Sequence, residues 1–182
     1  CFASTCASIV SGAVAERCKM ICYLAYAGFM SAIVYPVIAY WVWSSGVWLS
    51  PFNSDADSRI GVGVIDFAGS GVVHITGGMA ALIGAYFVGP RANHFYRTAS
   101  GEIRARDYTA NSQVARAVGV FTLWFGWYFL NGGTAFSLDY GNDKLVQIAS
   151  RAVVNTTLSA SSGSMVAGLL TIILTERQEE TH

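Results

Sequence analysis

Two ionisable residues, Asp66 and His74, lie inside a long apolar run of the sequence, roughly residues 62–88. About 20 apolar residues are enough to cross a bilayer as a helix. Ionisable groups at that depth are costly, so they usually face a bundle interior or a water-filled path. The run also contains six glycines, which let neighbouring helices come close. These features predict a polar path bounded by tightly packed helices.

The spacing of Asp66 and His74 limits what they could do together. On one α-helix, eight residues place them about 80° apart around the axis and about 12 Å apart along it. They could line one lumen at different depths, but they could not form a direct acid–base pair. Two simpler interpretations stay open. Asp66 could be only a helix cap, and His74 could be only a hydrogen-bond donor between helices.

The elements that must position these residues are apolar helices. The pattern predicts an all-α, polytopic transmembrane helix bundle with five spans, at approximately residues 1–15, 20–43, 62–88, 114–135 and 148–175. Pro36 lies inside the second span and predicts a kink or a local opening there. Trp41 and Trp48 suit an aromatic belt at the membrane interface. Polar loops are expected at residues 50–60, 90–113 and 136–147, followed by a charged tail from residue 176.

The distribution of lysine and arginine predicts the orientation of the spans. With five spans, eight of these residues fall on one side and three on the other, and the richer side is expected to be cytoplasmic. The eight are Arg17, Lys19, Arg91, Arg97, Arg104, Arg106, Arg116 and Arg177, and the three are Arg59, Lys144 and Arg151. The loop at residues 90–113 is therefore expected inside the cell, where it could also contact anionic lipid.

Composition supports a membrane protein and excludes several other classes. Of the 182 residues, 53% are hydrophobic and 12% are charged, whereas soluble domains carry about 25% charged residues. The net charge is zero, so nothing favours nucleic-acid binding. The spacing of the four cysteines is not that of a disulfide scaffold or a zinc site, and we expect all four to be small apolar core residues. They are Cys1, Cys6, Cys18 and Cys22. No nucleophile–base or paired-carboxylate arrangement indicates an enzyme, and no cofactor is expected.

The thirteen residues from Asp66 to Gly78, DFAGSGVVHITGG, resemble a motif of the ammonium transporter (Amt/Mep/Rh) family, in its Amt branch. The chain begins without Met and inside an apolar segment, and we expect a fragment that resembles roughly the third to seventh transmembrane helices of that family. The resemblance implies transport of ammonium or ammonia through a hydrophobic pore. It also implies a multi-pass protein of the plasma membrane, a homotrimer with one pore per subunit, and a cytoplasmic regulatory protein as a further partner.

The resemblance assigns roles at an outer site for ammonium. Trp43, in the segment WVWSSG, matches the tryptophan of the recruitment site, and Thr134 falls where relatives have a hydroxyl. Phe2, fifteen residues before Arg17, lies where the family has a pore-gating phenylalanine. Asp66 matches the aspartate that organises the outer vestibule, more by holding backbone than by touching the ion. Such a site needs aromatic faces for cation–π attraction and oxygen acceptors for the ammonium protons.

Three further residues are assigned to the pore by the resemblance. His74 matches the first of two pore histidines, and Trp127 matches a tryptophan that borders the pore. Leu130 stands where the second gating phenylalanine is expected, although Phe129 beside it could substitute. This departure puts the two-ring gate in question. The outer loop at residues 50–60 is also longer than in bacterial relatives, and the second pore histidine belongs to later helices.

Two functions other than transport are also compatible with the sequence. An ammonium sensor would keep the fold and site but signal through a cytoplasmic domain. An intramembrane metal or haem protein that uses His74 is the weaker hypothesis, because no matching His, Met or Cys constellation accompanies it.

Glu16 and Arg17 are expected to form a structural pair at the cytoplasmic helix end. His94 and His182 lie in polar segments and are expected to be solvated.

Overall fold

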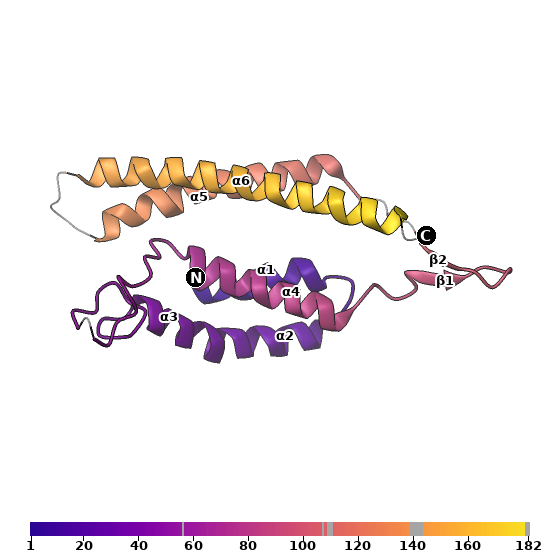
Figure 1. Ribbon diagram of the computed structural model, residues 1–182, viewed down its shortest axis with the longest axis horizontal. Helices are drawn as coiled ribbons and strands as arrows, with labels where there is room; N and C mark the ends of the chain where they lie inside the picture. Colours follow the sequence, from indigo (N-terminus) through magenta and orange to yellow (C-terminus); the bar gives the residue numbers. More distant parts are fainter. Residues whose placement is uncertain (56, 107, 109–110, 139–143, 181–182) are drawn as a thin grey trace. The chain divides into compact units, whose positions relative to one another are not determined.

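The computed structural model describes the chain except at residues 56, 107, 109–110, 139–143 and 181–182, and it omits the side chains of residues 136–143 and 175–182 (Figure 1). The described residues form two contact units, Cys1–Thr109 and Ala110–His182. Unit 1 holds four of the predicted site residues, Phe2, Trp43, Asp66 and His74. Unit 2 holds the other three, Trp127, Thr134 and Leu130. His182 lies outside the described residues.

Unit 1 begins with α1 (Phe2–Val14), which is followed by one long interrupted helix. Its parts are α2 (Met20–Phe29), the π-helical segment η1 (Met30–Val34) and α3 (Tyr35–Trp43). Pro36 stands in the first turn of α3, directly after η1. Proline has no backbone N–H and its ring clashes with the preceding turn, so the chain widens there instead of continuing as a regular α-helix. The local opening predicted at Pro36 is therefore present.

The apolar run that follows begins as a loop and not as a helix, which corrects the predicted start at residue 62. Helical structure begins with the π-helical segment η2 (Ser70–Ile75) and continues as α4 (Thr76–Val88). Gly63 has φ +82°, and a Cβ there would lie 2.6 Å from Pro51. Backbone N–H groups of this loop donate to the loop before it, from Ile60 to Trp48 and from Val64 to Leu49. These bonds and the left-handed glycine hold the first residues of the run out of the helix.

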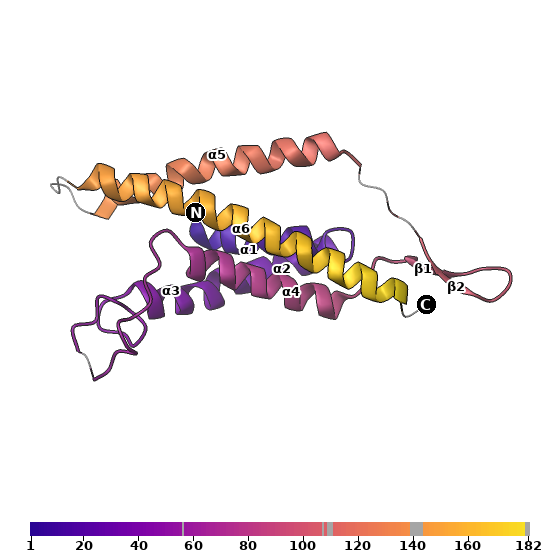
Figure 2. The ribbon, with the colours of Figure 1, turned by 45° about the horizontal axis from the view of Figure 1, so that its top comes forward.

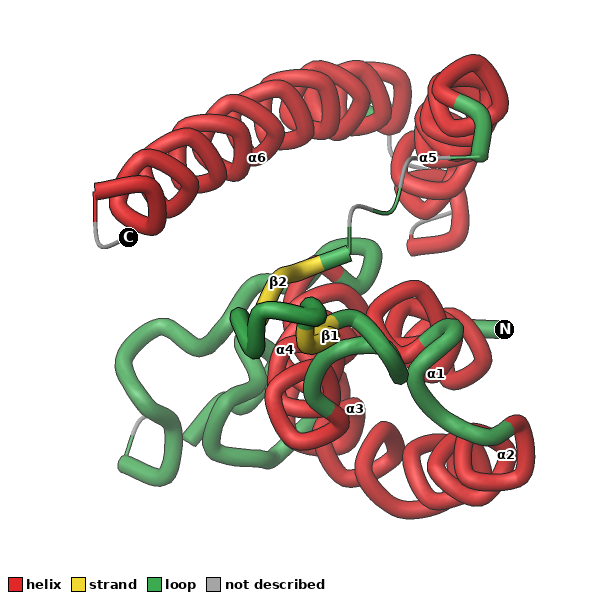
Figure 3. Tube along the Cα trace, turned by 90° about the vertical axis from the view of Figure 1, so that its right-hand side faces the viewer, coloured by secondary structure: helices red, strands yellow, loops and turns green. Residues whose placement is uncertain are grey.

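Small residues allow α1 to pack closely against α4. A Cβ at Gly77 would lie 2.9 Å from the carbonyl oxygen of Cys6 and 2.9 Å from Ile9 Cδ1, so only glycine fits at the crossing. Figure 2 shows α1, α2 and α4 side by side, and Figure 3 views the same helices nearly end-on. The core between them contains Cys6, Ala7, Met30 and Val73, each at most 4% exposed. The expectation that Cys6 is a small core residue is confirmed, whereas Cys1 and Cys22 are exposed.

The segment after α4 contains a small antiparallel hairpin where the sequence predicted only a polar loop. Its strands are β1 (Phe95–Arg97) and β2 (Ile103–Ala105), with Tyr96 opposite Arg104. Both strands are exposed throughout. Strands of three residues with no buried face leave no alternating hydrophobic pattern, so no sequence pattern predicts them.

Unit 2 is a pair of helices, α5 (Gln113–Leu138) and α6 (Leu145–Glu180). Polar bonds cross between them, with Tyr128 Oη 2.9 Å from Thr157 Oγ1 and Asn131 Nδ2 donating to Thr156 Oγ1 over 2.8 Å. Gly132 allows the close approach, because a Cβ there would lie 3.2 Å from Val153. Both helices extend beyond the predicted spans, which ended at residues 135 and 175.

Three of the described helices are long and apolar enough to cross a membrane: Met20–Trp43, Ser70–Val88 and Leu145–Leu174. α1 is a shorter apolar helix, and the five-span arrangement stays a prediction. Large apolar side chains on these helices, such as Leu24, Leu82 and Leu170, are more than half exposed. Such faces are suited to lipid or to further helices. The fold is a partial transmembrane helix bundle, and the protein is a multi-pass membrane protein.

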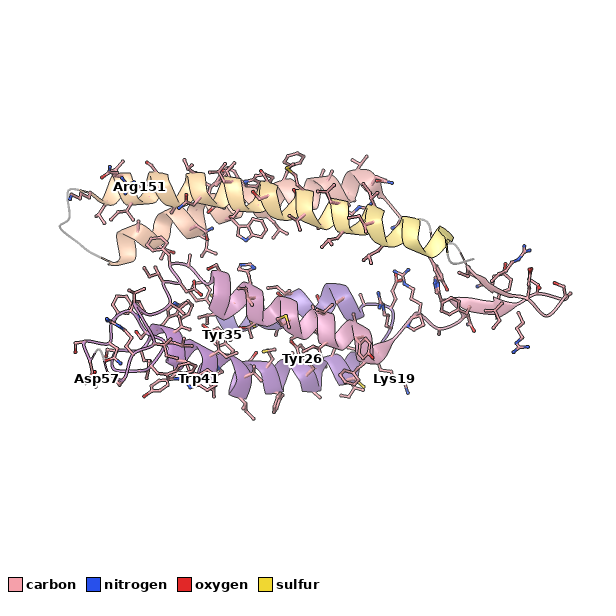
Figure 4. The ribbon with its side chains drawn as sticks, in the orientation of Figure 1. Lys19, Tyr26, Tyr35, Trp41, Asp57 and Arg151 are labelled. Atoms are coloured by element: carbon pink, nitrogen blue, oxygen red, sulfur yellow. The ribbon has the colours of Figure 1, made fainter. Side chains whose placement is uncertain are left out.

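The ends of unit 1 differ in chemistry. Trp41 and Asp57 lie at one end and Lys19 at the other, with Tyr26 and Tyr35 between them (Figure 4). The rings of Trp41 and Trp48 meet edge to face, with centroids 5.7 Å apart. This geometry agrees with an interfacial aromatic cluster at the end predicted to face outside.

The crossing of α1 and α4 generates a stability prediction. Gly77→Ala should destabilise the full-length protein by about 1–3 kcal/mol, because the added methyl group meets backbone and the Ile9 side chain. Gly78→Ala is the matched control, because a Cβ there meets nothing within 4 Å. Thermal unfolding in detergent should show a lower midpoint for the first variant only. Equal midpoints for the two variants would contradict the close packing at Gly77.

Candidate functional site

The carboxylate of Asp66 is the best-satisfied polar group of the site. Its Oδ1 accepts from the backbone N–H groups of Gly69 and Ser70, over 2.6 and 2.9 Å. Its Oδ2 accepts from those of Gly71 and Val72, over 2.9 and 2.7 Å. Asp66 is 8% exposed. One side chain therefore satisfies four N–H groups that the start of a helix would otherwise leave unpaired.

This capping depends on the backbone around Gly69. Gly69 has φ +99° and precedes the first helical residue, Ser70. A Cβ at Gly69 would lie 2.8 Å from Val73 Cγ2, so the position excludes a side chain as well as favouring a left-handed turn. Asp66 lies before the helix, and the estimate of 80° and 12 Å from His74 is therefore wrong. The capping interpretation of Asp66, which the sequence left open, agrees with this geometry.

Trp43 and Phe2 lie beside the Asp66 cap. The indole Nε1 of Trp43 donates to the backbone carbonyl of Asp66 over 2.9 Å. The rings of Phe2 and Trp43 are tilted by 48° with centroids 5.7 Å apart. Both side chains are half-buried. Residues from α1, from the end of α3 and from the loop before η2 thus meet in one place.

His74 lies in the π-helical segment η2, close to the capped end. Its backbone N–H donates to the carbonyl of Gly69, five residues earlier, and the N–H of Val73 donates to the same oxygen. The Thr76 hydroxyl donates to the carbonyl of Gly71, also five residues earlier. π-Helical turns occur often at functional sites. His74 is half-buried, whereas its neighbours Val72 and Val73 are 1% exposed.

The geometry divides the chemical tasks among these residues. With four backbone donors on its two oxygens, the Asp66 carboxylate is suited to bracing the loop more than to binding an ion directly. The aromatic faces of Trp43 and Phe2 are suited to attracting a small cation. Among the described residues, no group of three or more His, Cys, Asp or Glu side chains could hold a metal ion.

The remaining predicted site residues lie on α5. Trp127 is half-buried, and Leu130 is 39% exposed. The hydroxyl of Thr134 donates to the Leu130 carbonyl over 2.7 Å. Because these residues belong to unit 2, their grouping with Trp43 and His74 stays a prediction. The α5–α6 bond from Asn131 to Thr156 assigns Asn131 a packing role within that unit.

Two contacts near the opposite end of unit 1 correct sequence expectations. Glu16 Oε2 lies 2.7 Å from Arg91 Nε, and Arg17 Nη1 donates to the carbonyl of Gly89. Glu16 and Arg17 thus both tie the α1–α2 turn to the end of α4, instead of pairing with one another. His94 is half-buried and stacks on Tyr108 at 5.6 Å, so it is not simply solvated.

The site's most important unrecognised residue is Gly69. The sequence predicts it only as one of several glycines that permit close helix packing, whereas in the structure it turns the backbone so that four N–H groups converge. The available signal was a glycine three residues after an aspartate and directly before an apolar helix. That pattern combines a capping residue with a position suited to positive φ.

Comparison of the sequence with known protein families gives a match over the whole chain. The model of a family described as "Ammonium Transporter Family" matches residues 1–182, which is the whole chain. The chain belongs to the ammonium transporter family. The expected family is therefore confirmed, together with the partial transmembrane bundle. No solved structure gives a significant match to this ammonium transporter family member.

The curated relatives of this chain include several plant proteins. The chain is 41% identical over 170 residues to ammonium transporter 1 member 2 of Arabidopsis thaliana, covering 90% of this chain and 32% of the relative. It is 43% identical over 169 residues to putative ammonium transporter 1 member 5 of the same plant, covering 90% of this chain and 33% of the relative. It is 39% identical over 173 residues to ammonium transporter 1 member 1 of Oryza sativa subsp. japonica, covering 94% of this chain and 34% of the relative. The chain thus spans about a third of the length of these relatives.

The capping geometry generates a prediction for Asp66. Asp66→Ala should destabilise the full-length protein by several kcal/mol, because an unpaired buried N–H group costs about 1–3 kcal/mol. Asp66→Asn should be milder, because its side-chain carbonyl still accepts. Hydrogen exchange of the amides from Gly69 to Val72 should be fastest in Asp66→Ala, slower in Asp66→Asn and slowest in the parent. The thermal unfolding midpoint should be lowest in Asp66→Ala and highest in the parent.

Asp55→Ala is the control for this series. Asp55 Oδ1 accepts from one N–H group, that of Asp57, in an exposed loop, so its loss should change stability little. If Asp66→Asn abolished transport while expression, fold and assembly stayed normal, the carboxylate's charge would be essential and the bracing role would be insufficient.

Proposed function

We propose that the full-length protein transports ammonium or ammonia across a membrane, and that the end of unit 1 around Trp43 and Asp66 recruits the ion. The observation that carries this proposal is the tryptophan–phenylalanine pair fixed beside the capped helix end. The membership in the ammonium transporter family supports it independently. Uptake of labelled ammonium analogue by the full-length protein, in cells lacking their own transporters, tests the activity.

Recruitment rests on aromatic faces supported by a rigid loop. The hydrogen bond from Trp43 to the Asp66 carbonyl fixes the indole, so little side-chain freedom would be lost when a cation binds. The Asp66 cap holds that carbonyl in turn. In this proposal, the Thr134 oxygen accepts a hydrogen bond from the same ion.

Deprotonation follows recruitment, because an apolar pore strongly disfavours a charged ion. Ammonium releases a proton near the phenylalanine gate and continues as ammonia. Phe2 supplies one ring of that gate. Leu130 occupies the place of the second, so this protein either uses a gate with one ring and one aliphatic side chain or recruits Phe129.

His74 carries the next step in this proposal. A neutral imidazole can both donate and accept hydrogen bonds, which suits a partner for ammonia and for a moving proton. The released proton either returns to the outside or crosses separately by a route that His74 assists. Trp127 borders the same path. The π-helical turn around His74 supports a functional role for this residue, since such turns cluster at functional sites.

The wider assignments belong to the same proposal. We infer a homotrimer with one pore per subunit, in the plasma membrane, with ammonium uptake as its cellular role and a cytoplasmic protein as a regulatory partner. An ammonium sensor would retain the same outer site. Flux across the membrane, and not binding alone, therefore distinguishes the transporter from the sensor.

The recruitment step predicts the behaviour of Trp43 variants. Trp43→Leu should raise the KM for ammonium by several-fold to some tens-fold, because cation–π contacts contribute about 0.5–2 kcal/mol. Trp43→Phe retains an aromatic face but loses the bond to the Asp66 carbonyl, so an intermediate KM is expected. Uptake assays with ammonium and methylammonium over a range of concentrations measure both effects.

Trp48→Leu is the matched control for these variants. Trp48 is 41% exposed and contacts Trp41 away from the cap, so its loss should leave KM near the parent value. Unchanged uptake by Trp43→Leu across all concentrations would remove Trp43 from the recruitment site.

The pore step predicts the behaviour of His74→Ala. Removing the imidazole should open space and break the hydrogen-bonded path, which changes the species that crosses. Current and radiolabel flux measured together should show an altered ratio of charge to ammonium, or entry of potassium. His94→Ala removes an imidazole from the loop after α4 and should leave that ratio unchanged. If His74→Ala kept flux, charge coupling and potassium exclusion at parent values, His74 would be a packing residue.

A further inference from the structure

A basic cavity lies at the end of unit 1 opposite to the Asp66 cap. It is an open cavity of about 440 Å³ where the α1–α2 turn meets the end of α4, and it is lined by Arg17, Ala85, Gly89, Pro90, Arg91 and His94. None of these residues takes part in the proposed ammonium path. Two guanidinium groups and an imidazole in one cavity favour an anionic ligand.

The two arginines of the cavity are held in place by separate contacts. Arg17 Nη1 donates to the Gly89 carbonyl over 3.3 Å. Gly89 follows α4 with φ +73°, a backbone conformation that favours glycine. Arg91 is placed by its ion pair with Glu16, whose own φ is +63°. Each of the two guanidinium groups therefore has a protein contact that places it beside the cavity.

Aromatic rings support the same corner. The Arg91 guanidinium lies 5.0 Å from the centroid of the Tyr108 ring. The His94 ring also stacks on the Tyr108 ring, with centroids 5.6 Å apart. The ion pair engages Nε of Arg91, which leaves its terminal nitrogens as donors for a phosphate. Arginine binds phosphate well because its planar group offers two parallel donors.

Among the side chains that the structure describes, the charge around the cavity is predominantly positive. Glu16 faces Arg91 directly, and Glu102 is engaged by Arg104 on the hairpin. Lys19 follows Arg17 in the α1–α2 turn, while Arg97 and Arg106 belong to the segment after the cavity. The nearby acidic side chains therefore neutralise only part of the positive charge.

The position of the cavity favours a lipid over a free anion. Ala85 is part of the membrane helix, and its neighbours Tyr86 and Phe87 are 81% and 79% exposed. Exposed aromatic residues at a helix end are typical of the membrane interface. The lysine and arginine count predicts that this end is cytoplasmic, where the leaflet contains anionic lipids. An apolar surface thus lies next to a basic cavity.

We propose that this cavity binds the phosphate of an anionic phospholipid from the cytoplasmic leaflet. Arg17 and Arg91 contact the phosphate, and the exposed rings of Tyr86 and Phe87 lie against the acyl chains. The lipid would then bridge the α1–α2 turn and the end of α4, two segments that the Glu16–Arg91 and Arg17–Gly89 contacts already join. Lipid occupancy is predicted to stabilise this end of the bundle.

Binding of a short-chain phosphatidylserine to the purified full-length protein tests the proposal. Native mass spectrometry measures the affinity, with phosphatidylcholine of the same chain length as the neutral reference. The double variant Arg17→Gln and Arg91→Gln should lose affinity for phosphatidylserine by about fivefold for each charge removed. The control pair Arg97→Gln and Arg104→Gln removes the same charge from the exposed hairpin and should change affinity much less.

A second variant keeps the test informative if the arginine changes disturb folding. Ala85→Phe fills the cavity while leaving every charge in place, and it should weaken phosphatidylserine binding with the fold retained. If the cavity double variant and the hairpin double variant lost affinity for phosphatidylserine equally, the proposal would be overturned in favour of nonspecific electrostatic attraction. Inorganic phosphate that competes as well as the lipid would also overturn it, because a free-anion site would then be indicated. Preferential binding of an acidic peptide would assign the cavity to a protein partner instead.

Discussion

Four backbone N–H groups converge on the Asp66 carboxylate, and the end of unit 1 around Trp43 depends on this interaction. A helix that begins inside a membrane protein cannot leave its first donors unpaired, because little water is available to replace them. The carboxylate satisfies those donors, and the positive helix end stabilises the carboxylate in return. The same residue's carbonyl accepts the bond from Trp43. Folding of the helix start and placement of the aromatic site are therefore coupled.

This coupling gives the short segment from Asp66 to Gly77 several connected roles. Gly69 turns the chain, η2 holds His74, and Gly77 brings α4 against α1. Because α1 also supplies Phe2, the helix crossing sets the distance between the two rings of the aromatic pair. A change in packing at Gly77 would reach the aromatic site through the rigid body of α1. The packing of α1 on α4 and the geometry of the proposed site therefore depend on the same contacts.

The sequence predicted the residue types of this site better than their geometry. The apolar run, its ionisable residues and the aromatic residues made Asp66, His74 and Trp43 candidates, and Pro36 predicted the opening that η1 shows. The helix start was misplaced because residues 62–69 are apolar enough to continue a helix, while backbone pairing with the preceding loop and left-handed glycines prevent it. The contacts of Glu16 and Arg17 were missed because they join residues more than seventy positions apart. No local pattern encodes such a pairing, and the placement of Trp127, Thr134 and Leu130 depends equally on long-range packing.

The π-helical turn at Ser70–Ile75 also has a consequence for how this segment tolerates changes in length. A π-turn accommodates one residue more than an α-turn between the same flanking helical positions. Deleting one residue within it could convert the turn to regular α-helix while leaving Gly77 in register against Cys6 and Ile9. Deleting a residue from α4 instead would rotate everything beyond it by about 100° and turn its small face away from α1. The wide turn therefore holds one residue more than a regular helix needs, so a one-residue deletion there would leave the helix crossing below it in place.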